Sequence, residues 1–312
     1  MAQTSKLTKE NILEAVKDSW DLYLKKTVTA PIEVSYNHIT IDGSGMSSID
    51  ICFLGEYPNF VTESTTKNGK TDIIGGNTKY RFTLFKDIDN KYTLSSITPI
   101  TELLQESCHY PDLTTQNIIM TDYYFANSLV KSLMVTHVDF FPSYVRTHGF
   151  KINNFREIKE KEIEGIEIDF SYHPSNNDQL QMNGTVLLLP DYYWLIKRAK
   201  INFPDETNVT QKPWIEIENE FDIDSTNFPY LKRRTTVSFE SNITQRNETI
   251  FKNFSIINGF PTTRFTLSHY GLPEPDFGER RTNRIRYIIM AVGLLLIGIG
   301  AWRLIQKRRE NT

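Results

Sequence analysis

The feature that most constrains this sequence is a series of apolar residues alternating with polar ones between residues 164 and 256. A period of two places apolar side chains on one face of a strand, as in antiparallel strands with one buried face. The six runs are Glu164–Tyr172, Met182–Leu189, Trp194–Phe203, Trp214–Asp224, Tyr230–Phe239 and Glu248–Ile256. The short connections between them favour an antiparallel meander over a fold with parallel strands.

The N-terminal part predicts a helix followed by further strands. Apolar residues recur at helical spacing from residue 8 to residue 26, and Thr8 is a suitable N-cap. Alternation then predicts strands around residues 32–36, 49–53, 60–66, 80–84 and 92–94. We interpret Gly75-Gly76-Asn77 as a turn and expect a second helix over residues 113–138, where alternation is lost.

These patterns predict a mainly β fold of the α+β type. We expect a curved antiparallel sheet or incomplete barrel with one or two packed helices, plus a C-terminal transmembrane helix. The expected organisation is a β-rich extramembrane domain over residues 1–270, a Pro/Gly and basic linker over 271–286, a transmembrane helix over 287–305 and a short basic tail over 306–312.

The expected membrane anchor is the uncharged run from Tyr287 to Trp302. At about 1.5 Å per residue it spans roughly 24 Å, and an Arg303 that reaches toward the headgroups would extend the apolar stretch to residue 305. Aromatic residues at both ends suit the bilayer interface. The residues expected to form the anchor are Tyr287, Leu294, Leu295, Leu296, Trp302 and Arg303.

The charge distribution separates the expected anchor from the domain. Residues 280–312 carry a net charge of about +7. Because the whole chain has a net charge of −3, residues 1–279 carry about −10. An acidic domain of this kind argues against a nucleic-acid partner. Basic residues flank the anchor on both sides, so they do not determine its orientation. No apolar signal segment opens the sequence, which leaves a cytoplasmic domain with a tail anchor, or an extracytoplasmic domain whose signal precedes this chain.

Motifs for catalysis or metal binding fail on spacing. Asp87-x-Asp89-Asn90 begins like a calcium loop but lacks its glycine and its final glutamate. Cys108-His109 and His137-x-Asp139 could meet around zinc only through the tertiary fold, and bridging of Cys52 to Cys108 stays open. We therefore expect a protein that is not an enzyme and that uses no cofactor and no metal.

One strand carries a stripe of carboxylates. Over residues 214–224 the apolar side chains share one face, and Glu216, Glu218, Glu220 and Asp222 share the other. Lys232 and Arg234 on the next strand would face them across a hairpin. The stripe is either an ordinary solvated face or an interaction surface for a basic protein partner.

The string Phe265-Thr-Leu-Ser-His-Tyr-Gly-Leu-Pro-Glu-Pro275, followed by basic residues and an apolar segment, resembles a signature of uncharacterised, membrane-anchored planctomycete proteins. Gly184-Thr-Val-Leu-Leu-Leu-Pro190, together with Trp194, resembles their middle region. Those proteins are similar in pattern to lipoprotein carriers of the Lol type, in which an incomplete antiparallel barrel encloses an apolar cavity. The resemblance implies such a fold and a domain outside the cytoplasm; it departs at the N-terminus, where an exported relative would need a signal sequence.

Two functional hypotheses follow. The first is a single-pass, membrane-anchored, non-enzymatic binding module that holds an apolar or lipid ligand in a half-barrel. The second is a structural or protein-interaction domain displayed at the membrane through its acidic strand. The expected partners are the lipid bilayer, an apolar ligand and a protein, with no nucleic acid.

Overall fold

The computed structural model describes residues 8–100, 133–134, 141–160, 163–173, 181–203, 212–240 and 243–277. The chain divides into two compact units, residues 1–272 and residues 273–312. All helices and strands described here belong to the first unit. Residues 273–277 of the second unit form neither helix nor strand.

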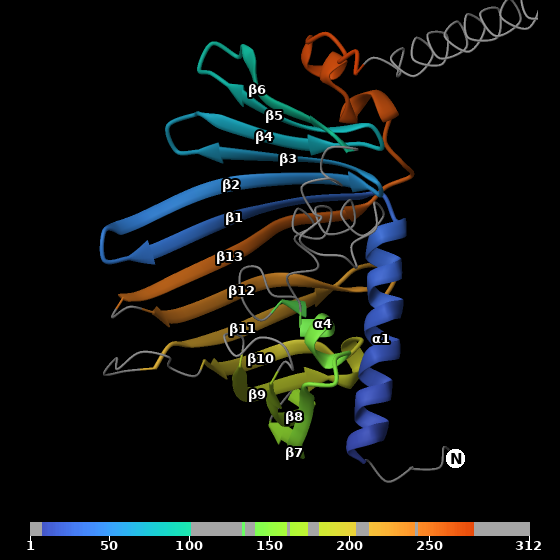
Figure 1. Cartoon of the computed structure of the whole chain (residues 1–312), viewed down its shortest axis with the longest axis vertical. Helices are drawn as coiled ribbons and strands as arrows, with labels where there is room; N and C mark the ends of the chain where they lie inside the picture. Colours follow the sequence, from blue (N-terminus) through green and yellow to red (C-terminus); the bar gives the residue numbers. More distant parts are fainter. Residues whose placement is uncertain are drawn as a thin grey trace, which may run out of the picture. The chain divides into compact units, whose positions relative to one another are not determined.

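A single antiparallel sheet of thirteen strands forms the first unit (Figure 1). The strands are β1 (Ile32–Asp42), β2 (Gly45–Glu56), β3 (Asn59–Thr66), β4 (Thr71–Gly76), β5 (Tyr80–Lys86), β6 (Tyr92–Pro99), β7 (Phe150–Glu160), β8 (Ile163–Tyr172), β9 (Met182–Leu189), β10 (Leu195–Asn202), β11 (Trp214–Ile223), β12 (Pro229–Glu240) and β13 (Ile243–Ile256). Their spatial order is β6-β5-β4-β3-β2-β1-β13-β12-β11-β10-β9-β8-β7. The first and last strands therefore pair at the centre, and the curved sheet stays open at β6 and β7.

The long helix α1 (Lys9–Thr29) precedes the sheet, as its sequence pattern predicts. The Thr8 side chain caps it by accepting a hydrogen bond from the backbone N–H of Asn11 at 3.2 Å. Ile12, Val16 and Trp20 lie on its buried side and are at most 2% exposed. Figure 1 shows the helix crossing the part of the sheet that contains β7 to β13.

We call the side of the sheet against which α1 packs the helix face. Its core combines residues of α1, of the short helix α4 (Phe141–Val145) and of strands β8 to β11. Ile168, Val186 and Ile217 point toward α1 and are at most 5% exposed. The indole Nε1 of Trp20 donates a hydrogen bond to the carbonyl oxygen of Trp194 at 2.9 Å, which fixes the helix to the turn before β10.

A second core lies on the opposite side of the sheet, which we call the far face. The chain after β13 crosses to this side and covers β2 to β5 with residues 257–272, here named the C-terminal strap. The strap contains two 3₁₀ helices, η5 (Thr262–Phe265) and η6 (Leu267–Tyr270). Its buried residues pack on Leu54, Val61, Ile73, Tyr80, Phe82 and Leu84.

Two strands lie outside the predictions, β4 and β7. Gly75 and Gly76, interpreted as a turn, are the last residues of β4, and the turn follows at Asn77. A Cβ on Gly75 would come within 2.2 Å of the Phe82 ring, so the ring of the neighbouring strand occupies the space above the glycine. β7 is an edge strand whose side chains are mostly exposed, so it shows no apolar alternation.

Several expectations fall outside the described residues. The helix predicted for residues 113–138 lies outside the described residues except for Leu133 and Met134. The segment 287–305 lies outside them entirely. In the part of the chain that the structure describes, no helix combines the length and the apolar character needed to cross a bilayer.

Candidate functional site

The acidic strand predicted from the sequence is β11, and its carboxylates lie on the far face. Three of the four form ion pairs with cations of the neighbouring strands: Glu216 with Lys200 (2.6 Å), Glu220 with Arg233 (3.8 Å) and Asp222 with Lys232 (3.8 Å). The stripe is therefore one row of a charge ladder across β10, β11 and β12. A basic partner would have to compete with these cations for Glu216, Glu220 and Asp222.

Arg234 does not join this ladder, contrary to the expectation that it faces the acidic strand. A β-bulge between Glu220 and Phe221 shifts the register, and Arg233 takes the position opposite Glu220. Arg234 turns to the helix face, where it is 7% exposed and its Nη2 donates to the carbonyl oxygen of Met134 at 3.0 Å. Burial lowers the pKa of its guanidinium to about 10.

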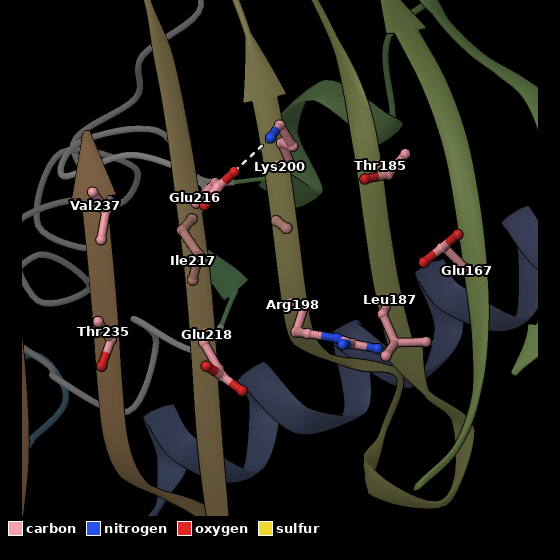
Figure 2. A pocket seen from close by; sticks show the side chains of 11 residues that line it. Glu167, Thr185, Leu187, Arg198, Lys200, Glu216, Ile217, Glu218, Thr235 and Val237 are labelled. Carbon is pink, nitrogen blue, oxygen red and sulfur yellow. Dashed lines mark hydrogen bonds and ion pairs between the residues drawn. The ribbon is translucent and has the colours of Figure 1, made fainter. Parts of the chain in front are cut away.

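A hollow of about 440 Å³ lies on the far face of β8 to β12, and Figure 2 shows its lining. Lys200 and Glu216 form their ion pair on one side, and the Arg198 side chain lies across β9 beside Leu187. Leu187 is only 2% exposed, and the guanidinium end of Arg198 lies beside it in Figure 2. Cations and carboxylates alternate on this surface, so it lacks the apolar character that a lipid requires.

The space between α1 and the sheet is filled by side chains. The cavity between Ile12, Val16, Trp20 and the strands below them has a volume of about 10 Å³. That is about the minimum for one water molecule. Aromatic rings close the space, with Phe141 packed against both Trp20 (5.8 Å between ring centroids) and Phe170 (5.2 Å). This part of the helix face has no room for an apolar ligand.

A larger hollow opens on the helix face where α1 ends, and we call it the helix-end pocket. It has a volume of about 290 Å³ and lies between the last turn of α1, the start of β1, the end of β13 and the turn that joins β11 to β12. Its apolar wall consists of Ala30, Ile32, Phe228, Phe254 and Ile256. Ile32 and Ile256 are directly opposite each other in the β1–β13 ladder, so both side chains project from the same face.

Aromatic stacking holds the wall of the helix-end pocket in place. Phe228 stacks on Tyr23 of α1, with 5.2 Å between ring centroids and 9° between ring planes. Phe254 stacks in turn on Phe228 at 6.5 Å and on Tyr230 at 4.8 Å. Phe228 is 6% exposed and Ile32 is 1% exposed, whereas Ile256 is 45% exposed. The wall is thus rigid at its base and accessible at its rim.

The polar groups of the helix-end pocket are one lysine and two threonines. Lys26 lies in the last turn of α1, and its Nζ donates a hydrogen bond to the Tyr193 hydroxyl at 2.6 Å. The same ammonium lies 5.1 Å from the centroid of the Tyr193 ring and 6.0 Å from that of Phe228. Thr27 donates its hydroxyl to the carbonyl oxygen of Leu24 within the helix.

Asp224 organises the turn that carries Phe228. Its Oδ1 accepts hydrogen bonds from the backbone N–H groups of Thr226 and Phe228, both at 2.8 Å, and from the Thr226 hydroxyl at 2.7 Å. Partial burial alone would raise the pKa of this carboxyl, but the three hydrogen bonds outweigh burial and hold the pKa below its ordinary value. The carboxylate thereby fixes the position of Phe228.

Other expected site residues lie beyond the described part of the chain. The residues outside the described part are the anchor residues Tyr287, Leu294, Leu295, Leu296, Trp302 and Arg303, and also Cys108, His109, His137 and Asp139. Cys52 has a free thiol on β2, and burial raises its pKa. Among the residues that the structure describes, no group of three His, Cys, Asp or Glu side chains could hold a metal ion.

Comparison with known proteins gives neither a family nor a curated relative. No protein-family model matches the sequence, and no curated protein matches it.

Solved structures similar to this chain include a putative outer membrane lipoprotein-sorting protein domain from Vibrio parahaemolyticus (8% identity, TM-score 0.41, 83% of this chain and 100% of that chain). A LolA superfamily protein from Nitrosomonas europaea matches at 9% identity and a TM-score of 0.41, over 84% of this chain and 99% of that chain. A DUF1329 family protein from Desulfovibrio piger matches at 10% identity and a TM-score of 0.42, over 82% and 99%. At such scores the ligand of this chain has to be inferred from its own geometry.

Proposed function

We propose that this chain is a non-enzymatic binding module that holds an apolar chain in the helix-end pocket. The observation that carries the proposal is the contrast between two places on the helix face. The space under α1 is filled to about 10 Å³, whereas the pocket at the end of α1 leaves about 290 Å³ between apolar side chains. An open apolar pocket beside a filled core is the usual form of a small-molecule site.

The size of the pocket suits a single alkyl chain. A water molecule occupies about 30 Å³ in the liquid, so the helix-end pocket accommodates about ten groups of similar size. The volume is close to the lower end of the range of about 300–1,000 Å³ for small-molecule sites. Each buried methylene contributes about 0.8 kcal/mol, so an alkyl chain of roughly ten carbons would gain enough from burial to bind.

A photoreactive alkyl probe tests the proposal on the full-length chain. We would use a ten-carbon alcohol with a diazirine on its chain and map the labelled peptides by mass spectrometry. Labelling is expected on the peptides that contain Ile32 and Phe254, and excess unlabelled decanol should suppress it. In the variant Ile256→Glu we expect roughly tenfold less labelling, because binding of the alkyl probe would have to desolvate a carboxylate in the apolar wall.

The matched control is Ile250→Glu. Ile250 lies on the same strand, is 38% exposed and points to the far face, so its replacement should leave the labelling unchanged. Labelling that is spread over the surface, or that responds equally to both substitutions, would rule out the helix-end pocket as the binding site.

We propose further that residues 287–305 anchor the module in a bilayer and that the domain lies outside the cytoplasm. The anchor is supported by the uncharged run of sixteen residues from Tyr287 to Trp302. Alkaline carbonate should leave the protein in the membrane fraction, whereas the double variant Leu294→Arg, Leu296→Arg should be released. Each arginine at the centre of a bilayer costs about 2.5–3.5 kcal/mol or more. Reporter fusions at both ends would give the orientation, and a wild-type chain released by carbonate would contradict the anchor.

A further inference from the structure

We infer that the helix-end pocket selects amphiphiles with an anionic head group, and that Lys26 is the residue that recognises the head. This inference rests on the proposed binding of an apolar chain and adds the class of ligand. The chemistry is an alkyl chain that ends in a carboxylate or phosphate, with the chain against Ile32 and Phe254 and the head at the rim.

The first observation is the environment of the Lys26 ammonium. It contacts the Tyr193 hydroxyl and two aromatic rings, which are neutral groups. Within the part of the chain that the structure describes, no carboxylate forms an ion pair with it. Four cations of the sheet differ in this respect, because Lys200, Lys232, Arg233 and Lys252 each pair with a carboxylate. Lys26 is therefore a positive charge at the rim of an apolar pocket with its ion-pairing capacity still available.

The second observation is that Lys26 is held in place. Its Nζ has three donor protons, and the Tyr193 hydroxyl accepts one of them at 2.6 Å. Two protons thus remain for a carboxylate or phosphate oxygen. Because one hydrogen bond already fixes the long side chain, an arriving anion causes a smaller loss of side-chain entropy than it would at a mobile lysine.

The third observation is the backbone that presents Tyr193. Tyr193 and Trp194 have φ values of 54° and 56°, the left-handed region that non-glycine residues seldom adopt. Both residues of this turn contact α1, Tyr193 through Lys26 and Trp194 through the indole of Trp20. The fixed turn thus joins the recognition group to the core of the helix face.

Asp224 is the carboxylate of the turn that forms part of the helix-end pocket, and its negative charge disfavours an anion nearby. Its Oδ1 accepts three hydrogen bonds from Thr226 and Phe228, which stabilise its charge within the turn. The C-terminal end of α1 carries a partial negative charge, which attracts the Lys26 ammonium but also repels an anion, so the attraction for an anionic head comes from the ammonium alone. Lys26 is solvent-exposed, and an ion pair at an exposed site changes affinity by a factor of about two to five.

Competition against the photoreactive alcohol on the full-length chain tests this inference. The competitors are decanoate, decyl phosphate, decanol and decyltrimethylammonium, all below their micelle concentrations. Decanoate and decyl phosphate should each suppress labelling at about two- to fivefold lower concentration than decanol, and the cationic amphiphile should be weakest. Comparison of the two anions shows whether a carboxylate or a phosphate fits better, and both are within the inferred class.

Variants assign the preference to Lys26. Lys26→Gln should remove the advantage of decanoate over decanol, whereas Lys26→Arg should retain it. Lys25→Gln is the matched control, because it removes one charge from the same helix turn next to the pocket lysine. Tyr193→Phe keeps the ring but removes the hydroxyl, so it should reduce the advantage partially.

The two proposals fail in different ways. If the alcohol does not label the pocket, the binding of an apolar chain is wrong. If it labels the pocket but decanoate and decanol compete equally, or if Lys25→Gln acts like Lys26→Gln, only the selection of an anionic head by Lys26 is overturned.

Discussion

The two halves of the sheet bury opposite faces. In the half formed by β7 to β12, the helix face is the core and the far face carries the charge ladder. In the half formed by β2 to β6, the far face is the core under the C-terminal strap. Partly exposed residues such as Ile74, at 45%, lie there on the helix face. One continuous sheet therefore belongs to two cores on opposite sides.

The change of face takes place at β2 and β3. Phe53 on the helix face and Leu54 on the far face are both buried, and so are Phe60 and Val61 on the next strand. These strands are covered on both sides at this end, which joins the two cores through the sheet. A long, open sheet can thus be stabilised without closing into a barrel, because each half has its own cover.

The largest expected effect concerns α1, which covers the half of the sheet formed by β7 to β12, here called the helix half. Trp20→Ala should lower the free energy of unfolding by about 3–5 kcal/mol, because it removes a fully buried ring and leaves the Trp194 carbonyl without its indole donor. Urea unfolding of the full chain, followed by circular dichroism, measures the loss. Leu22→Ala on the same helix is the control: Leu22 is 48% exposed, so a change within about 0.5 kcal/mol is expected. Equal losses in both variants would show that α1 does not cover a core.

A matched pair of substitutions on the far face tests the switch itself. Val61→Asn, under the strap, should cost about 3 kcal/mol, because it buries an amide at a site that is 1% exposed. Val237→Asn changes the same residue type on the same face in the helix half, where the side chain lines the open hollow, and should cost about 1 kcal/mol or less. The same urea assay gives both values, and similar costs would contradict the assignment of opposite cores.

The sequence predicts which residues alternate but not which face becomes the core. Ile32, Val34 and Tyr36 reveal a strand, and so do Tyr80 and Phe82, yet the first set lies on the helix face and the second lies on the far face under the strap. Which face of a strand is buried depends on the pairing register across the whole sheet, and a local sequence pattern does not contain that information. The strands with clear alternation and the helix cap at Thr8 are confirmed for this reason, while the switch of face could not be predicted.

The helix-end pocket also had no local signal. Its residues come from the end of α1, the first residue of β1, the β11–β12 turn and the end of β13. The first two are neighbours in the sequence, but the other two lie far along the chain, and the pairing of β1 with β13 brings them together. The acidic strand, by contrast, is visible in the sequence, but its partners Lys200 and Arg233 depend on the register and on a bulge. Sequence periodicity predicts the helices and strands, whereas the pairing of strands determines which residues meet in a pocket or an ion pair.

A smaller effect is expected where the strap joins the sheet. Asn77, 8% exposed, donates through Nδ2 to the carbonyl oxygen of Phe265 at 2.9 Å and accepts from the backbone N–H groups of Lys79 and Tyr80. Asn77→Ala should cost about 1–3 kcal/mol, since it leaves buried backbone groups without partners. Hydrogen exchange should rise first at Leu267 in the strap and leave α1 unchanged. The control is Thr78→Ala, at an exposed position of the same turn; faster exchange throughout α1 would mean that the two covers are not independent.

The smallest expected effect belongs to the uncovered far face of the helix half. Glu216→Gln breaks the ion pair with Lys200, whose two side chains are 45% and 57% exposed, and should cost about 0–1 kcal/mol. Near 1 M salt the Debye length falls to about 3 Å and an exposed ion pair stabilises less, so the variant should unfold close to the wild-type urea concentration. Val61→Asn on the same face should keep its full cost at high salt, because desolvation rather than ion pairing causes it. A loss for Glu216→Gln that persists in salt would mean that the ladder, too, is covered, and that the far face is a core along the entire sheet.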